Sequence, residues 1–280
     1  MAPRKKYIVK EGENAPPLIT ESIPEDLQSS PSDAHDGYYK EWIQYRPNEF
    51  IPTPVLDIHK FIPPGGYNIK WDYQNNWPIF IKKPVYLDEL LSLPDPIFNA
   101  ILDDIQYFWD NKPKFGEYKF TYKRGILLYG PPGSGKTSLI SLLSEDIVGR
   151  GGIVINIKDA ADLQFYVDAV SKIFRNIQPN TPILTIMEDI DGLASIREIE
   201  SMLLNVLDGS YQLANVVYLA CTNYPEKLEA RILNRPSRFD KRYLIGLPNA
   251  EVRKFYLQHK IHQKDLDQID IDDIVKKTEG

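Results

Sequence analysis

From residue 96 onward, short apolar runs alternate along the chain with segments of helical periodicity. Ile97, Ile101, Ile105 and Phe108 keep the spacing of one helix face, which predicts a helix over 96–110. Apolar runs predict strands at 126–129, 153–157, 183–187, 216–221 and 243–245, and helical patterns lie between them at 136–147, 161–176 and 196–207. Strands that are apolar along their length and alternate with helices are typical of a parallel sheet covered on both faces. The pattern therefore predicts an α/β fold whose ligands bind at the carboxyl ends of the strands.

The residues before this pattern differ in character. Residues 1–36 are basic in the first ten positions, then acidic and interrupted by prolines, so we expect a disordered leader that is either a solvated tail or a partner-docking tail. Residues 37–95 hold three of the four tryptophans and predict short strands and turns, with a turn at Gly65–Gly66. We interpret this part as an N-terminal accessory region whose aromatics pack in a core, a base-stacking surface being the alternative.

Composition narrows the class of protein. The chain has 280 residues and a formal net charge of −6, so a globally basic nucleic-acid binder is not indicated, although a local basic patch stays open. Its one cysteine, Cys221, cannot form an internal disulfide, which suits a reducing compartment. Neither a signal peptide nor an apolar stretch of membrane-spanning length is visible, so we expect a cytoplasmic protein with no membrane span.

The chemistry starts at the end of the strand predicted at 126–129. Gly130–Thr137 fit G-x-x-x-x-G-K-[ST], the phosphate-binding P-loop, between a strand and a helix as that motif requires. Glycines let backbone N–H groups turn around an anion, Lys136 can reach the β- and γ-phosphates, and the Thr137 hydroxyl can ligate Mg²⁺. The predicted nucleotide-binding residues are Gly130, Pro131, Pro132, Gly133, Ser134, Gly135, Lys136, Thr137 and Ser138.

Polar side chains also follow two other predicted strands. Glu188 and Asp189 end the strand at 183–187, and Asn223 follows the strand at 216–221. One carboxylate near Mg²⁺ fixes its water shell, and a second can orient the attacking water. The neutral amide of Asn223 can hydrogen-bond the water or the γ-phosphate.

Taken together, the run from Gly130 to Asp240 resembles the core of an AAA-type ATPase. The acids after the third strand resemble the family's Walker B, Thr222–Pro225 resemble its sensor 1, and Arg235–Asp240 resemble its R-P-G-R-F-D arginine-finger segment. Within the family the chain is most similar to the branch of the mitochondrial chaperone that inserts the Rieske protein, on the basis of Tyr122–Tyr129 and the order Glu188-Asp189.

The resemblance implies a P-loop NTPase fold and a role for each matching residue. Glu188 takes the metal-side role together with Thr137, and Asp189 serves the catalytic water. Arg235 and Arg238 act in trans on the γ-phosphate of the neighbouring subunit, although Asn234 is an extra residue before them. The family's aromatic–aliphatic–glycine pore loop is absent, and Phe165–Asp168, its nearest approximation, are expected to pack in the core.

The sequence thus predicts a P-loop NTPase of four parts. These are a disordered leader (1–36), an aromatic-rich N-terminal accessory region (37–95), an AAA ATPase core (96–248) and the start of an incomplete or reduced helical lid (249–280). The expected activity is Mg²⁺-dependent hydrolysis of ATP to ADP and phosphate, with Lys136, Glu188, Asp189, Asn223, Arg235 and Arg238 in the catalytic set. The expected assembly is a homo-oligomeric ring, a hexamer or heptamer, that remodels a macromolecular partner, with a protein favoured over DNA. The alternatives are a DNA-handling ATPase and an ATP-binding switch or scaffold with little turnover.

Overall fold

The computed structural model describes residues 41–53, 59–85, 91, 93–208, 213–233, 235, 237–261 and 269–279. The leader predicted over 1–36 and the extra residue Asn234 lie outside them. Within this described part of the chain, no helix is both long enough and apolar enough to cross a bilayer.

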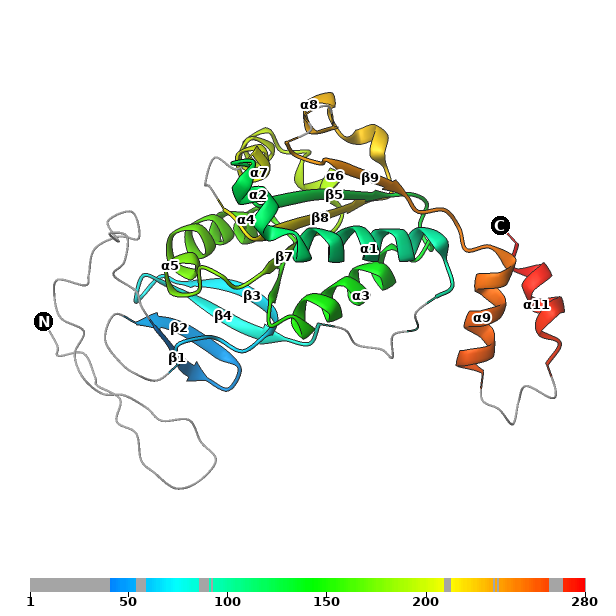
Figure 1. The fold of residues 1–280 in the computed structure, drawn as a ribbon, viewed down its shortest axis with the longest axis horizontal. Helices are drawn as coiled ribbons and strands as arrows, with labels where there is room; N and C mark the ends of the chain where they lie inside the picture. Colours follow the sequence, from blue (N-terminus) through cyan, green and yellow to red (C-terminus); the bar gives the residue numbers. More distant parts are fainter. Residues whose placement is uncertain are drawn as a thin grey trace, which may run out of the picture.

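One nine-stranded sheet organises the molecule (Figure 1). Its strands are β1 (Glu41–Arg46), β2 (Glu49–Thr53), β3 (Gly65–Asp72), β4 (Trp77–Lys83), β5 (Lys123–Tyr129), β6 (Ile153–Ile157), β7 (Ile183–Met187), β8 (Val216–Thr222) and β9 (Lys241–Leu244). They are ordered β1-β2-β4-β3-β6-β7-β8-β5-β9, and every pairing from β6 to β9 is parallel. The predicted parallel α/β sheet is therefore confirmed.

The aromatic-rich N-terminal region continues this sheet. Strands β1 to β4 pair antiparallel with one another, and β3 joins β6 in parallel through Gly65–Tyr67. The turn predicted at Gly65–Gly66 is wrong, because these glycines begin β3. A side chain at Gly66 would lie 3.2 Å from the carbonyl oxygen of Lys83, so glycine allows the neighbouring strand to come close.

Helices lie on both faces of the sheet (Figure 1). They are α1 (Pro96–Asp110), α2 (Lys112–Glu117), α3 (Lys136–Gly149), α4 (Ala160–Tyr166) with a π-helix (Val167–Phe174) and α5 (Arg175–Ile177), α6 (Ile190–Leu193), α7 (Arg197–Asp208), a 3₁₀ turn (Pro225–Lys227), α8 (Ala230–Leu233), α9 (Ala250–Lys260) and α11 (Ile271–Lys277). Helix α1 begins as its sequence predicts, with Pro96 in the first turn and the Asp95 side chain accepting from the Ile97 amide at 2.9 Å.

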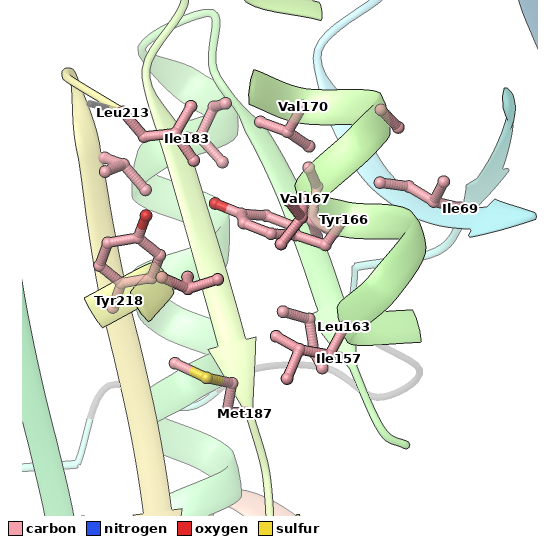
Figure 2. Packing of buried hydrophobic residues seen from close by; sticks show 14 of the residues in the cluster. Ile69, Ile157, Leu163, Tyr166, Val167, Val170, Ile183, Met187, Leu213 and Tyr218 are labelled. Atoms are coloured by element: carbon pink, nitrogen blue, oxygen red, sulfur yellow. The ribbon is translucent and has the colours of Figure 1, made fainter. Parts of the chain in front are cut away.

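Alternation along the strands divides the core in two. Ile126 and Leu128 of β5 pack with α1 and α3, whereas Leu127 joins the residues of α4, the π-helix and α7. Figure 2 shows the second core, where Tyr166 of α4 and Tyr218 of β8 point toward one another among aliphatic side chains on one face of the sheet.

Most of the aromatics that the sequence singled out are structural. Tyr166 is fully buried and its hydroxyl accepts from Thr185 at 2.9 Å, while the Phe165 ring stacks on Trp71 with centroids 6.3 Å apart. The expected core packing of Phe165–Asp168 is thus confirmed for its aromatics. Trp42 is also fully buried, edge-on to Phe80.

The segment that ends at Asp240 lies across the start of β5. The Gly125 amide donates to the Asp240 carboxylate at 2.8 Å, and a Cβ added at Gly125 would stand 1.6 Å from the Arg238 carbonyl oxygen. Only a residue without a side chain fits between these two backbones.

We therefore expect Gly125→Ala to destabilise the fold by at least ~2 kcal/mol, because the contact is with backbone that no rotamer change relieves. Gly149→Ala is the matched control, since a Cβ there meets nothing within 4 Å. Urea unfolding of both variants measures the difference. Equal stability of the two would contradict this packing.

Candidate nucleotide site

The loop between β5 and α3 is built to expose backbone N–H groups. Gly130, Gly133 and Gly135 have φ values of 152°, 76° and 89°, a region that L-residues with side chains rarely adopt. Gly130 also lies against β9's continuation, because a Cβ there would stand 2.0 Å from the Ile245 carbonyl oxygen. The glycine positions of the predicted P-loop therefore follow from backbone geometry.

Lys136 is folded into this loop. Its ammonium donates to the carbonyl oxygens of Gly130 at 2.9 Å and Pro131 at 2.8 Å and to the Ser134 hydroxyl at 3.1 Å. The residue is 8% exposed, and burial lowers the pKa of its ammonium while the nearby Asp189 carboxylate opposes that change. The Lys136 ammonium therefore lies beneath the loop, hydrogen-bonded to loop oxygens that phosphate oxygens can replace.

The outer side of the loop is open. Pro131, Pro132 and Gly133 are exposed, as are Thr137 and Ser138 in the first turn of α3. The free N–H groups and the positive end of this 14-residue helix favour an anion there. The loop and the first turn of α3 therefore present donors and hydroxyls to the same space.

The strand register brings the predicted acids and amide to this loop. Tyr129 of β5 pairs with Thr222 of β8, and Met187 of β7 pairs with Ala220, so Gly130, Glu188 and Asn223 follow neighbouring strand ends. The Gly130 amide donates to the Thr222 carbonyl at 3.3 Å, which places the half-buried Asn223 next to the loop.

Asp189 has an unusual backbone. Its φ of 49° and ψ of 47° are left-handed, and both it and Glu188 are exposed. Burial raises the pKa of the Cys221 thiol to about 11; a hydrogen bond with the Asp189 backbone and the charge of Lys136 oppose this rise, and the carboxylates of Glu188 and Asp189 add to it. A non-glycine residue in this conformation costs on the order of 1 kcal/mol or more, and such strain is concentrated at functional sites.

A cleft of about 420 Å³ opens beside the loop. It is lined by Leu93, Asp95, Phe98, Gly133, Ser134, Gly135, Ser138, Pro248, Val252, Arg253, Tyr256, Leu257 and Thr278. Sequence reasoning missed the residues outside the loop, because they come from the start of α1 and from α9 and the end of α11. Figure 1 shows α9 and α11 together, beyond the amino end of α1.

The two predicted finger arginines lie at the other end of β5. Arg238 is 6% exposed and binds Asp208 through two nitrogens, each 2.9 Å from a carboxylate oxygen, which lowers the pKa of Asp208. Arg235 binds the same carboxylate at 3.0 Å but is 65% exposed. Asp208, at the end of α7, thus holds the whole segment, and no motif in the sequence pointed to it.

Another unpredicted acid supports the strand ends. The Thr222 hydroxyl donates to Asp191 at 2.6 Å and accepts from the Tyr224 amide at 2.9 Å. This bond ties the turn after β7 to the turn after β8, on either side of Asn223.

The oxygen ligands at this site suit an Mg²⁺ ion that is held mainly by a bound phosphate. Across the described residues, no three His, Cys, Asp or Glu side chains gather as a metal site. Mg²⁺ in nucleotide sites is held by phosphate oxygens, waters and one or two protein oxygens, and the oxygens predicted for that role, those of Thr137 and Glu188, are both exposed.

Comparison with known proteins agrees with this geometry. Residues 126–247 match the family described as "ATPase family associated with various cellular activities (AAA)". The chain is similar to the ATP-dependent zinc metalloprotease FtsH of Aster yellows witches'-broom phytoplasma, 31% identical over 62% of this chain and 27% of that protein. It is also similar to Protein SAV of Sulfolobus acidocaldarius, 32% identical over 56% of this chain and 21% of that protein, and to the ATPase family gene 2 protein of Schizosaccharomyces pombe, 32% identical over 56% and 20%. The chain therefore spans a fifth to about a quarter of the length of these relatives.

Removing the Lys136 ammonium tests the site. We expect Lys136→Ala to weaken the binding of a fluorescent ATP analogue at least ~10-fold, because a charge-assisted contact is worth roughly 1.5–3 kcal/mol. Lys158→Ala is the matched control, an exposed lysine just after β6. Unchanged affinity in a folded Lys136→Ala protein would rule out the phosphate-binding assignment.

Proposed function

Since residues 126–247 match the AAA family of ATPases, we propose that this chain is an AAA-type ATPase that binds ATP with Mg²⁺ and hydrolyses it to ADP and phosphate. The observation that carries the proposal is the juxtaposition of the Lys136 loop with Glu188, Asp189 and Asn223 at one edge of the sheet. Phosphoryl transfer needs little covalent chemistry from the protein, so positioning and charge neutralisation suffice.

ATP would lie across the loop and the adjoining cleft. The triphosphate would meet the N–H groups of the loop, and Lys136 would exchange its carbonyl partners for β- and γ-phosphate oxygens. Phe98, Val252 and Tyr256 give the cleft an apolar, aromatic wall that suits a base.

The metal would be held by Thr137 and, on the side of β7, by Glu188. When bound, Mg²⁺ neutralises charge on the phosphate oxygens. Glu188 is exposed and immediately follows the buried end of β7, so its carboxylate can meet a hydrated ion directly or through water.

Asp189 and Asn223 would manage the attacking water. The water oxygen forms a bond to the γ-phosphorus while the bond to the bridging β–γ oxygen breaks, and Asp189 accepts the water's proton. The Asn223 amide would orient the water or the γ-phosphate without adding charge. The left-handed backbone of Asp189 supports this role, because strain of that kind is expected where a side chain must be aimed.

The arginines would serve a neighbouring copy. The Arg238 backbone lies against Gly125, and five residues of extended strand, about 16 Å, separate Gly125 from Gly130. The finger segment is therefore far from its own loop, which supports action in trans. Arg235 is the better candidate for direct contact with phosphate, since Arg238 is buried against Asp208.

A ring of identical subunits that remodels a macromolecular partner is the assembly consistent with this arrangement. One surface of each subunit carries Arg235 and a different surface carries Lys136, and such head-to-tail contacts form a ring when the rotation between subunits closes. A protein partner is proposed ahead of DNA. The finer placement, in the branch of the Rieske-protein-inserting chaperone, rests on Tyr122–Tyr129 and on the order Glu188-Asp189.

The acidic pair gives a sharp test. We expect Asp189→Asn to keep ATP bound but slow hydrolysis at least ~10²-fold, the low end for general-base assistance. Glu188→Gln should instead weaken the Mg²⁺ dependence of turnover. Phosphate release at several Mg²⁺ concentrations measures both. If the two variants show each other's expected phenotypes, the roles of Glu188 and Asp189 are reversed. If the wild type releases no more phosphate than a control without enzyme, the chain is an ATP-binding switch.

Assembly gives a second test. We expect Arg235→Ala to bind ATP normally and lose ~10³-fold or more in turnover, as arginine fingers do in related sites. Arg242→Ala is the control, because Arg242 is an exposed arginine on β9, the strand that follows Arg235 in the chain. Arg238→Ala should lose stability as well as turnover, since it leaves the Asp208 carboxylate with fewer partners.

Co-expression separates a trans mechanism from a local defect. Arg235→Ala and Lys136→Ala subunits together should regain part of the activity, because one interface then pairs an intact arginine with an intact loop. Specific activity that does not change with concentration, in a chain that light scattering shows to be monomeric, would refute the trans mechanism.

A further inference from the structure

The segment from Lys112 to Arg124 concentrates basic and aromatic residues on an acidic chain. Lys112, Lys114, Lys119, Lys123 and Arg124 lie within it, with Glu117 as its single acid, whereas the whole chain carries a net charge of −6. This local reversal of charge is a footprint that polyanions recognise.

Large rings stand out into solvent in the same place. Tyr107, Tyr118 and Phe120 are 58%, 66% and 70% exposed, and Lys112, Lys114 and Lys119 are exposed around them. We call these six residues the α2 patch. The Lys114 ammonium lies 3.3 Å from the Tyr107 hydroxyl, which joins the end of α1 to α2 in one surface.

A buried aromatic base holds the patch. Phe108 and Tyr122 stack with centroids 4.4 Å apart, Phe115 meets Tyr122 at 5.0 Å, and the Tyr122 hydroxyl donates to the Phe108 carbonyl at 3.0 Å. The Phe120 amide donates to the Phe115 carbonyl at 2.9 Å, with the intervening Lys119 in a left-handed conformation. The exposed rings thus project from a fixed backbone, which reduces the entropy that binding would cost.

Two carboxylates near the patch are paired with arginines, whereas Glu117 within the segment and Asp103 on α1 form no ion pair among the described residues. Asp110 binds Arg150 at 2.9 Å, and Asp104 binds Arg124 at 2.9 Å. Lys123 points inward to the carbonyls of Leu207 and Ser237. Lys112 and Lys114 contact the neutral oxygens of Asn180 and Tyr107, so their charges still face outward.

The patch is separate from the nucleotide cleft. Asp95 and Phe98 line the cleft at the amino end of α1, and Tyr107, the first residue of the patch, lies nine residues beyond Phe98, about 14 Å along the helix axis. Figure 1 shows α2 at the end of α1 that is remote from α9 and α11.

We propose that the α2 patch binds single-stranded nucleic acid, with its lysines on phosphates and its rings stacked on bases. Stacking on Tyr118 and Phe120 needs unpaired bases, which favours a single strand over a duplex. A lipid surface fits less well, because the rings alternate with lysines and two of the three carry hydroxyls, so there is no continuous apolar face.

The test is the binding of a fluorescein-labelled oligothymidylate of about 20 nucleotides to the full chain, measured by anisotropy without ATP. We expect binding that weakens with salt, with a log–log slope of about −2 for three lysine–phosphate contacts. Phe120→Ala and Tyr118→Ala should each weaken it about tenfold, and Lys119→Gln should reduce the slope by about 0.7. Tyr73→Ala and Lys70→Gln are matched controls, since both residues are exposed at the end of β3 and should leave binding unchanged.

Several results would overturn the proposal. They are no binding by the folded wild type, equal losses in the controls, and equal affinity for a duplex of the same length. Two further results would reassign the patch. Capture by phosphatidylserine vesicles that Phe120→Ala abolishes, without oligonucleotide binding, would make it a membrane contact. A change of oligomeric state in Phe120→Ala, with oligonucleotide affinity intact, would make it a subunit contact. Because no ATP is used, these outcomes are independent of the proposed ATPase.

Discussion

The parallel register of β5 with β8 and β9 is the constraint on which the rest of the structure depends. Tyr129 opposite Thr222 sets the start of the loop against the turn that carries Asn223. At the other end of β5, the backbone of Arg238 lies directly against Gly125, because β9 begins three residues after Arg238. A shift of one residue would turn every β5 side chain to the opposite face and move both ends out of place.

Helix α7 fixes the finger segment through two acids. Glu200, 1% exposed, takes two nitrogens of Arg231, and Asp208 takes two of Arg238, whose third nitrogen donates to the Arg231 carbonyl. Removing one partner of the Arg238–Asp208 pair, in which Arg238 is buried, would cost ~3–5 kcal/mol, so this contact resists rearrangement. Arg235 differs, because its ion pair with Asp208 is exposed and contributes little free energy, so Arg235 can readily bind a phosphate oxygen instead.

The elements from β5 to β9 could be predicted because their apolar periods are strong and their loops carry recognisable chemistry. The short strands expected in residues 37–95 are present, but their arrangement as an antiparallel extension of the same sheet could not be predicted. The glycines of β3 have the local pattern of a turn, and the pairing with β6 joins residues nearly ninety positions apart. The π-helix after Tyr166 escaped for another reason, because its apolar spacing also fits an α-helix. In the site, the loop and strand-end acids were visible as motifs. Asp208, Asp191 and the cleft residues Phe98 and Tyr256 could not be recognised as motifs, because folding alone brings them to their places.

The state of Lys136 links stability to function. A buried ammonium without partners would be expensive, and here its three donors are met by two carbonyls and a hydroxyl of the loop itself. The loop is therefore stable with its cation already partly desolvated. A phosphate that displaces these oxygens meets a charge that the fold has already partly desolvated, so contact with it is stronger than with a lysine drawn from water. When the phosphate leaves, the ammonium can bond to the same loop oxygens again, which favours release of the product. A loop of this kind would hold its ligand by exchange of equivalent partners, and that property suits the repeated binding and release of nucleotide proposed for this chain.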